Sequence, residues 1–278
     1  MRNLSRPQIS ASEIYDSASE RFLDQSLRAA FQQSRMDFLA VANDYGIRGD
    51  TKTLHEMPVG NPVSQIVDAT HLRNLYSQGL LRRRSRARLY YEQIRLSSPY
   101  NICPYCNHRT VGSVDHYLPK ESYPLLAVCP ENLIPACSDC NKIKSNKTFG
   151  SYLESPVHPY FDYVNEDPWL RCDLLSVGSD WVATFCIESD FIEPPIAAKL
   201  QSHFNDFGLG ELYAVAASTE LSRQSNLINQ YASAGGQSAV RDYLQKLVIS
   251  EEAFCLNHWR AALARSCVRT ADFAASFV

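Results

Sequence analysis

The sequence contains no run of about 18 apolar residues, so it predicts no transmembrane helix. The first residues, MRNLSRPQISASE, have no apolar core after the arginines, which is unlike a secretory signal. Internal repeats and low-complexity tracts are also absent, and no GxxxxGKS/T phosphate-binding motif is present. We therefore expect a cytoplasmic globular protein without membrane contact and without a P-loop ATPase domain in this sequence.

Charge is low overall but unevenly distributed. The net charge of the 278 residues is −3, whereas residues 70–150 hold 12 Lys and Arg against 5 Asp and Glu, a net +7. Residues 151–278 carry a net −8, with 8 basic and 16 acidic residues. A basic segment of this kind is typical of a surface that binds a polyanion, while the acidic remainder is not expected to bind nucleic acid unaided.

Hydrophobic spacing predicts mainly helices before the centre of the chain. Apolar residues recur at helical intervals over 12–46 and 70–97, and the Pro- and Gly-containing stretch 47–69 is expected to be a loop. Short strands are expected at 110–116 and at Asn132–Pro135, followed by a helix from Ser138. The centre of the chain thus predicts a strand, a turn, a second strand and a helix.

After the central stretch, the pattern changes to one strand and then helices. Trp181–Ile187 alternates and is rich in β-forming residues, and helices are expected at about 211–232, 239–249 and 251–266, with Gly235 and Gly236 separating the first two. We interpret the chain as an α+β protein. Its expected domains are a helical region at 1–97, a central core at 98–165, and a mixed, then helical region at 166–278.

Two CxxC pairs frame the central stretch, Cys103 with Cys106 and Cys137 with Cys140. Paired CxxC motifs in a cytosolic chain indicate a metal site more often than disulfides, and four thiolates complete a tetrahedral Zn²⁺ site without an open position. This predicts a structural zinc ion. The other cysteines, in apolar surroundings, are expected to be small buried hydrophobic residues: Cys129, Cys172, Cys186, Cys255 and Cys267.

Four polar residues lie within or beside this frame: Asp115, His116, Asn132 and Asn141. A carboxylate and an amide oxygen, from Asp115 and Asn141, are the hard ligands that suit Mg²⁺ or Mn²⁺ at a phosphate site. A neutral His116 can take a proton from an attacking water molecule. Asn132 is expected to brace the loop that carries His116, and a turn residue is the alternative for it.

The motifs CPYC, DHYLPK, NLIPAC and CNKIK resemble those of HNH endonucleases of the zinc-stabilised ββα-metal type, over roughly residues 100–150. The resemblance implies that His116, Asn132 and Asn141 fill the three signature positions, and that hydrolysis of DNA leaves a 5′ phosphate. The glycine pair that many members carry between the first two positions is replaced by KESYPLLAVCPE.

A fainter pattern, which includes LYYEQI, HPYFDY and Asn257-x-Trp259, resembles HNH effectors of phage-defence systems such as Septu and retron-linked ones. That resemblance implies a nuclease effector of a bacterial anti-phage defence system that works with a separately encoded ATPase.

Nucleic-acid contacts are expected from basic side chains near the motif. Arginine matches phosphate geometry, although a solvated helix face is the alternative for the arginine cluster. The expected contact residues are Arg82, Arg83, Arg84, Arg86, Arg88, Lys120, Lys144 and Lys147, and the three lysines are expected to be exposed.

Two alternatives to a nuclease fit the same sequence. A zinc-dependent module that binds nucleic acid without catalysis needs the basic residues but not Asp115, His116 and Asn141. A scaffold subunit with a structural zinc needs neither, and it fits the acidic helical region at 166–278.

Overall fold

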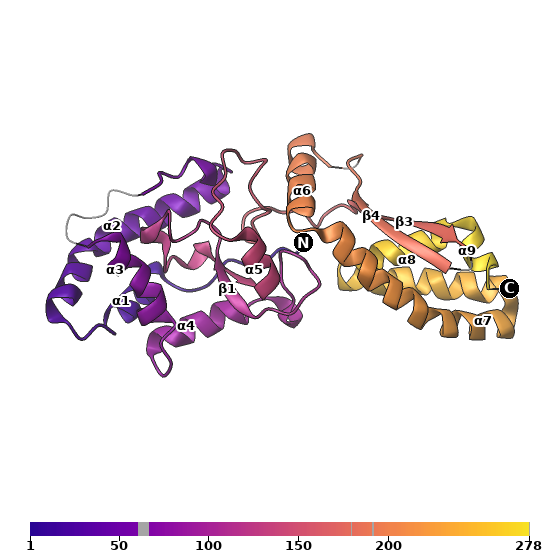
Figure 1. Cartoon of the computed structure of the whole chain (residues 1–278), viewed down its shortest axis with the longest axis horizontal. Coiled ribbons are helices and arrows are strands. Elements are labelled where there is room, and N and C mark those ends of the chain that lie inside the picture. Colours follow the sequence, from indigo (N-terminus) through magenta and orange to yellow (C-terminus); the bar gives the residue numbers. More distant parts are fainter. Residues whose placement is uncertain (61–66, 179, 191, 278) are drawn as a thin grey trace. The chain divides into compact units, whose positions relative to one another are not determined.

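The computed structural model describes residues 1–60, 67–178, 180–190 and 192–277 (Figure 1). The chain divides into two compact units: an N-terminal unit, Arg2–Tyr163, and a C-terminal unit, which comprises Val164–Val278 and Met1. Helices and short sheets form both units, so the fold is α+β. Among the described helices, none is both long and apolar enough to cross a membrane.

The N-terminal unit begins with two helices, α1 (Ala11–Ser19) and α2 (Gln25–Asp50). A single helix over 12–46 was expected, and that prediction is wrong at both its continuity and its end. Asp24 starts a second helix, because its carboxylate accepts hydrogen bonds from the backbone N–H groups of Ser26 and Leu27. The two helices pack through aromatic rings: Tyr15 of α1 stacks on Phe38 of α2, with ring centroids 4.5 Å apart.

The segment expected as one helix over 70–97 is also divided. It comprises α3 (Ala69–Asn74), a π-helical turn η2 (Leu75–Leu80) and α4 (Arg86–Arg95). The Ser85 hydroxyl caps α4 by accepting from the Arg88 N–H at 3.1 Å, which allows the chain to turn before it. Arg82, Arg83 and Arg84 therefore lie on a turn between helices, not along a helix face.

The centre of the N-terminal unit contains the strand, strand and helix that were expected. Strand β1 (Ser113–His116) pairs antiparallel with β2 (Leu133–Ala136), with His116 opposite Leu133, and α5 (Ser138–Lys144) follows (Figure 1). Helix α4 packs on both strands. Four 3-10 turns complete the unit: η1 (Leu54–Glu56), η3 (Pro99–Asn101), η4 (Pro124–Leu126) and η5 (Pro130–Asn132).

The C-terminal unit is a β-hairpin covered by helices. Strand β3 (Leu170–Val177) pairs antiparallel with β4 (Asp180–Ile187), and helices α7 and α8 pack on this sheet. The strand at 181–187 was expected, whereas β3 was not. Buried Asn257 holds the start of β3, since its side-chain oxygen accepts from the N–H groups of Trp169 and Leu170. The helices of this unit are α6 (Pro194–Asp206), α7 (Leu209–Phe254), α8 (Trp259–Arg269) and α9 (Ala271–Ala275).

Helix α7 turns back on itself at Gly235 and Gly236, as expected. Gly236 has a φ of 63°, a conformation that favours glycine. The two arms of α7, before and after these glycines, meet at Tyr243. Its ring stacks on that of Tyr231, with centroids 4.7 Å apart, and its hydroxyl donates a hydrogen bond to the Gln224 side chain. The helix expected to begin near Ser250 does not begin there, because the second arm continues to Phe254.

The cysteines outside the CxxC pairs divide into two groups. Cys129, Cys172 and Cys267 are buried, as expected for small hydrophobic residues. Cys186 is exposed on β4 and Cys255 is half-buried, so the prediction is wrong for these two. Side chains alternate between the two faces of a strand, and Cys186 follows the buried Phe185, which places it on the outer face of the hairpin.

We expect Gly79→Ala to destabilise the N-terminal unit by about 1–3 kcal/mol, because overpacking a buried site has a cost of this size. A Cβ atom at Gly79 in η2 would lie 2.7 Å from the backbone oxygen of Ala18 in α1, and backbone atoms cannot move aside easily. Gly46→Ala in α2 is the control, since its Cβ would meet only the end of the Glu131 side chain. Denaturant unfolding followed by circular dichroism measures both variants; equal stability of the two would contradict the expectation.

Candidate active site

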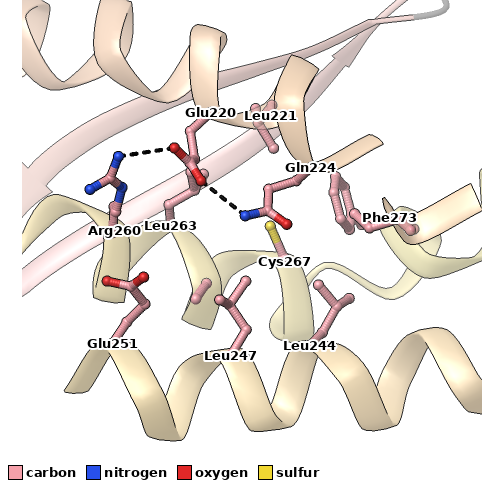
Figure 2. Close-up of a pocket in the computed structure, with 12 residues that line it drawn as sticks. Glu220, Leu221, Gln224, Leu244, Leu247, Glu251, Arg260, Leu263, Cys267 and Phe273 are labelled. Atoms are coloured by element: carbon pink, nitrogen blue, oxygen red, sulfur yellow. Dashed lines mark hydrogen bonds and ion pairs between the residues drawn. The ribbon is translucent and has the colours of Figure 1, made fainter. Parts of the chain in front are cut away.

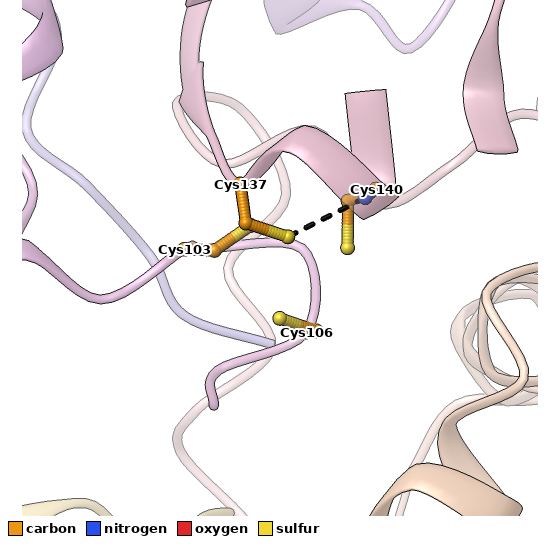
Figure 3. A group of neighbouring side chains, drawn as sticks. All are labelled: Cys103, Cys106, Cys137 and Cys140. Carbon is orange, nitrogen blue, oxygen red and sulfur yellow. Dashed lines mark hydrogen bonds between the residues drawn. The ribbon is translucent and has the colours of Figure 1, made fainter. Parts of the chain in front are cut away.

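The four CxxC cysteines lie together in the N-terminal unit. Cys137 caps helix α5, Cys140 lies in its first turn, and Cys103 and Cys106 approach from the loop after η3 (Figure 3). All four are buried, and their sulfur atoms lie within 4.8 Å of one another. A tetrahedral zinc site with Zn–S bonds of about 2.3 Å places its sulfurs about 3.8 Å apart. The cluster is thus positioned to bind a metal ion, and its donor set fits structural zinc.

Backbone N–H groups support the sulfur atoms. The Arg109 N–H donates to the Cys106 sulfur, and the Cys140 N–H donates to the Cys137 sulfur, each at 3.4 Å (Figure 3 draws the second). Such donors stabilise the thiolate form that binds zinc. The loop is closed by the Asn107 N–H, which donates to the Cys103 oxygen at 2.7 Å.

A cleft of about 420 Å³ lies beside β1 and α5. It brings together three of the four residues predicted to be catalytic, namely Asp115, His116 and Asn141. The fourth, Asn132, does not line it. The other lining residues are Tyr76, Val114, Pro119, Lys120, Lys142, Ser145 and Asn146.

His116 ends strand β1 and is 8% exposed. Its Nε2 atom lies 2.8 Å from the carbonyl oxygen of Ala127. A carbonyl can only accept, so we assign the hydrogen to Nε2 and the lone pair to Nδ1. Burial lowers the pKa of His116 to about 3, so the ring is neutral near pH 7. The Tyr76 ring packs edge-on against it, with centroids 4.4 Å apart.

Asp115 is also buried, and its side-chain partners differ from those of His116. Its Oδ2 atom accepts a hydrogen bond from the Tyr105 hydroxyl at 3.0 Å and forms an ion pair with the Lys144 ammonium at 3.3 Å. Burial raises the pKa of the Asp115 carboxyl to about 6, and the charge of Lys144 opposes that rise. The Tyr105 hydroxyl and the Lys144 ammonium thus share one carboxylate oxygen.

Asn141 contributes an amide to the same cleft from helix α5. Its Nδ2 atom donates to the Ser113 hydroxyl at 3.0 Å, which fixes the amide orientation and leaves Oδ1 as an oxygen ligand. Carboxylate and amide oxygens at one cleft are the donors that Mg²⁺ and Mn²⁺ prefer. Asp115 and Asn141 are therefore the residues of this cleft that could hold a divalent ion.

Asn132 braces the segment between β1 and β2. It is fully buried, its Oδ1 atom accepts from the Leu118 N–H at 2.7 Å, and its Nδ2 atom donates to the Leu118 and Leu126 oxygens at 3.0 and 3.2 Å. The next residue after Leu126 is Ala127, the partner of His116. Asn132 thus acts on the cleft only through the backbone.

The expected nucleic-acid contacts divide into exposed and enclosed residues. Arg82, Arg83, Arg84, Arg86 and Lys147 are exposed, and Lys120 lines the cleft beside its ion-pair partner Glu121.

For Lys144 the expectation of exposure is wrong. It is 2% exposed, because its ammonium group is held by Asp115 and by the His116 oxygen. Arg88 is half-buried, pairs with Glu92 and lies over the Tyr91 ring, so it too is occupied within the unit.

Sequence reasoning missed three residues at or next to the cleft. Tyr76 comes from η2, and no motif in the neighbouring sequence identifies it as a site residue. Tyr105 lies between the first two cysteines, where a bound metal would fix its position, as it would for Asn141. Its place within a CxxC motif could therefore have identified it from the sequence. Lys142 is exposed and lines the cleft next to Asn141.

His158 does not line the cleft. It is 1% exposed, and its Nε2 atom lies 3.0 Å from the Tyr45 hydroxyl. Its ring packs on those of Tyr117 and Phe161. These contacts give His158 a place in the aromatic core of the N-terminal unit.

A second pocket lies in the C-terminal unit, between the two arms of α7 and helix α8 (Figure 2). Leucine side chains line it, and Glu220 at its edge bonds to Gln224 and Arg260. Its volume is about 20 Å³, which is room for a single water molecule and not for a substrate.

Comparison with known proteins gives two relatives. The chain is 25% identical to protein ea31 of Escherichia phage lambda in an alignment of 296 positions, gaps included, which covers 98% of this chain and 99% of that protein. It is 36% identical to Septu protein PtuB of Bacillus thuringiensis over 78 residues, which cover 26% of this chain and 30% of PtuB. No protein-family model matches, and no solved structure matches.

We expect the purified chain to contain one zinc ion and Cys140→Ser to lose it. Structural zinc contributes roughly 10–16 kcal/mol of apparent binding free energy to a small unit, so this variant is expected to unfold around the CxxC pairs. Cys186→Ser is the matched control, since Cys186 is exposed and lies outside the cluster. Elemental analysis by mass spectrometry gives the zinc content; full zinc in Cys140→Ser would refute the four-thiolate site.

We expect Asn132→Ala to destabilise the N-terminal unit by about 2–4 kcal/mol. The change removes three hydrogen bonds and leaves buried backbone groups of Leu118 and Leu126 without those partners. Unfolding in denaturant measures the loss, with the exposed Asn146→Ala as control. A loss below about 0.5 kcal/mol, typical of surface changes, would mean that Asn132 does not brace this segment.

Proposed function

We propose that this protein is a metal-dependent endonuclease of the HNH type that hydrolyses phosphodiester bonds in DNA. The observation that carries the proposal is His116: a buried, neutral imidazole with Nε2 donating to a carbonyl and Nδ1 available as a base. It lines one cleft with the two oxygen donors Asp115 and Asn141. A module that only binds nucleic acid, or a scaffold, does not need this arrangement of side chains.

The chemistry assigned to the residues follows from their atoms. Water attacks the phosphorus atom and His116 Nδ1 takes a proton from it as the P–O3′ bond breaks. The phosphate stays on the 5′ side, and the departing 3′ oxygen takes a proton from solvent to become a hydroxyl. Asp115 and Asn141 would hold Mg²⁺ or Mn²⁺, which stabilises negative charge on the phosphate and the leaving oxygen when bound. Lys120 and Lys142 line the cleft and are suited to contact phosphate oxygens.

The substrate assignment rests on charge. Arg82, Arg83, Arg84 and Arg86 are exposed on and beside the turn that follows η2, and η2 contributes Tyr76 to the cleft. Exposed arginines close in sequence to a cleft wall favour a polyanion held along its backbone. We assign DNA because the sequence motifs resemble those of DNA-cleaving HNH enzymes.

The biological role we propose is that of a nuclease effector in a phage-defence system. The local similarity to Septu protein PtuB supports it, together with the resemblance of the sequence motifs to Septu-type effectors. The relative that aligns over nearly the whole chain is a protein of Escherichia phage lambda. An ATPase partner on a separate chain belongs to the same proposal.

We expect the zinc-loaded protein to nick plasmid DNA with Mg²⁺ or Mn²⁺, and EDTA to stop the reaction. His116→Ala is expected to lower the rate by about 10²–10⁴-fold, the usual contribution of a general base. His71→Ala is the matched control, because His71 pairs with Asp68 and lies outside the cleft. Agarose-gel assays of supercoiled and nicked plasmid give the rates.

Two results would decide against the nuclease. Salt-sensitive DNA binding that is unchanged in His116→Ala, without cleavage by wild type alone or with an ATPase partner, would support the non-catalytic module. Absence of binding even at low salt, unaffected by charge reversal at Arg82, Arg83, Arg84 and Arg86, would support the scaffold.

A further inference from the structure

Lys144 is an enclosed cation next to the proposed ion site. Its ammonium nitrogen lies 2.7 Å from the His116 oxygen, 3.3 Å from Asp115 Oδ2 and 3.4 Å from the Ser145 oxygen. An ammonium group has three hydrogens to donate, and these three acceptors match them. At 2% exposure, a lysine in this position is not a surface residue that happens to lie near the cleft.

Its contacts join the two elements that form the site. Lys144 belongs to α5, which also carries Asn141, and both of its closest partners belong to the last two residues of β1. Lys144 therefore fixes the strand end relative to the helix and draws one carboxylate oxygen of Asp115 toward the helix. The Tyr105 hydroxyl contacts the same oxygen of Asp115, Oδ2.

The same geometry places two positive charges on one carboxylate. If Asp115 holds a divalent ion, that ion and the Lys144 ammonium share the charge of a single buried group. Their mutual repulsion is screened only weakly at a buried position. Lys144 thus weakens the attraction of Asp115 for the ion while it holds the carboxylate in place.

We propose that Lys144 is a positioning residue that competes with the divalent ion for Asp115, so that the ion is held firmly only when substrate phosphate is present. The inference rests on the proposed function, because it concerns the ion site of that function. A substrate phosphate adds negative charge that compensates for the positive charge of Lys144, and Mg²⁺ sites often take substrate phosphate oxygens as ligands. Ion binding and substrate binding are then coupled.

The test is Mn²⁺ binding to the zinc-loaded full chain without DNA, measured from the electron paramagnetic resonance signal of free Mn²⁺ in mildly alkaline buffer. Lys144→Gln and Lys144→Met remove the charge, and Gln keeps a donor for the His116 oxygen in case Met impairs folding. Both variants, checked by circular dichroism, are expected to bind Mn²⁺ at least about fivefold more tightly than wild type.

Three controls separate charge from other effects. Tyr105→Phe removes the other side-chain donor of the same oxygen without a change of charge, and is expected to alter the affinity by less than about threefold. Lys246→Gln is a matched lysine change, since that side chain is 72% exposed, and it is expected to have no effect. Asn141→Ala is expected to abolish the binding that the other variants report.

The outcomes for this inference and for the nuclease are distinct. Equal or weaker Mn²⁺ binding by folded Lys144→Gln would overturn the competition while wild-type cleavage still supported the nuclease. Tighter binding by Lys144→Gln in a protein that never cleaves DNA would support the competition and count against the nuclease. No Mn²⁺ binding by wild type or any variant would overturn the competition, and plasmid cleavage would still decide for or against the nuclease.

Discussion

Four thiol groups that must meet at one point set the geometry of the N-terminal unit. The two CxxC pairs are separated by the 30 residues from 107 to 136, and those residues hold β1, β2 and the segment between them. Once the sulfur atoms share a metal, the start of α5 is fixed against the loop at Cys103 and Cys106. Tyr105 lies within that loop and Asn141 follows a ligand directly, so the metal also places two residues that face Asp115 and the cleft.

The cleft itself is made from buried polar groups, which must find partners inside the protein. His116 meets the Ala127 oxygen, Asn132 meets Leu118 and Leu126, and Lys144 meets the His116 oxygen. Each hydrogen bond positions one polar group and also gives a buried donor or acceptor its partner. A neutral imidazole and a paired carboxylate can therefore stand side by side on β1, although burial alone opposes charge on both.

Short-range patterns in the sequence predicted the site better than they predicted the helices. The CxxC spacing and the Asp115-His116 pair identified residues that the structure brings together, since fixed spacing reflects fixed chemistry. The helix boundaries failed where single side chains, Asp24 and Ser85, start new helices inside apolar patterns. Lys144 was predicted to be exposed, but it is buried, because its ion-pair partner Asp115 comes from a strand that is distant in the sequence. Tyr76 was missed for a similar reason, since its partner, the Val114 oxygen, also belongs to that strand.

Every residue that lines the cleft falls between Tyr76 and Asn146, inside the N-terminal unit. The C-terminal unit has its own hairpin, helices and core. The described lining of the cleft is therefore encoded by one continuous stretch of the chain, so that variants of the cleft can be made without changes to the residues that pack the C-terminal unit.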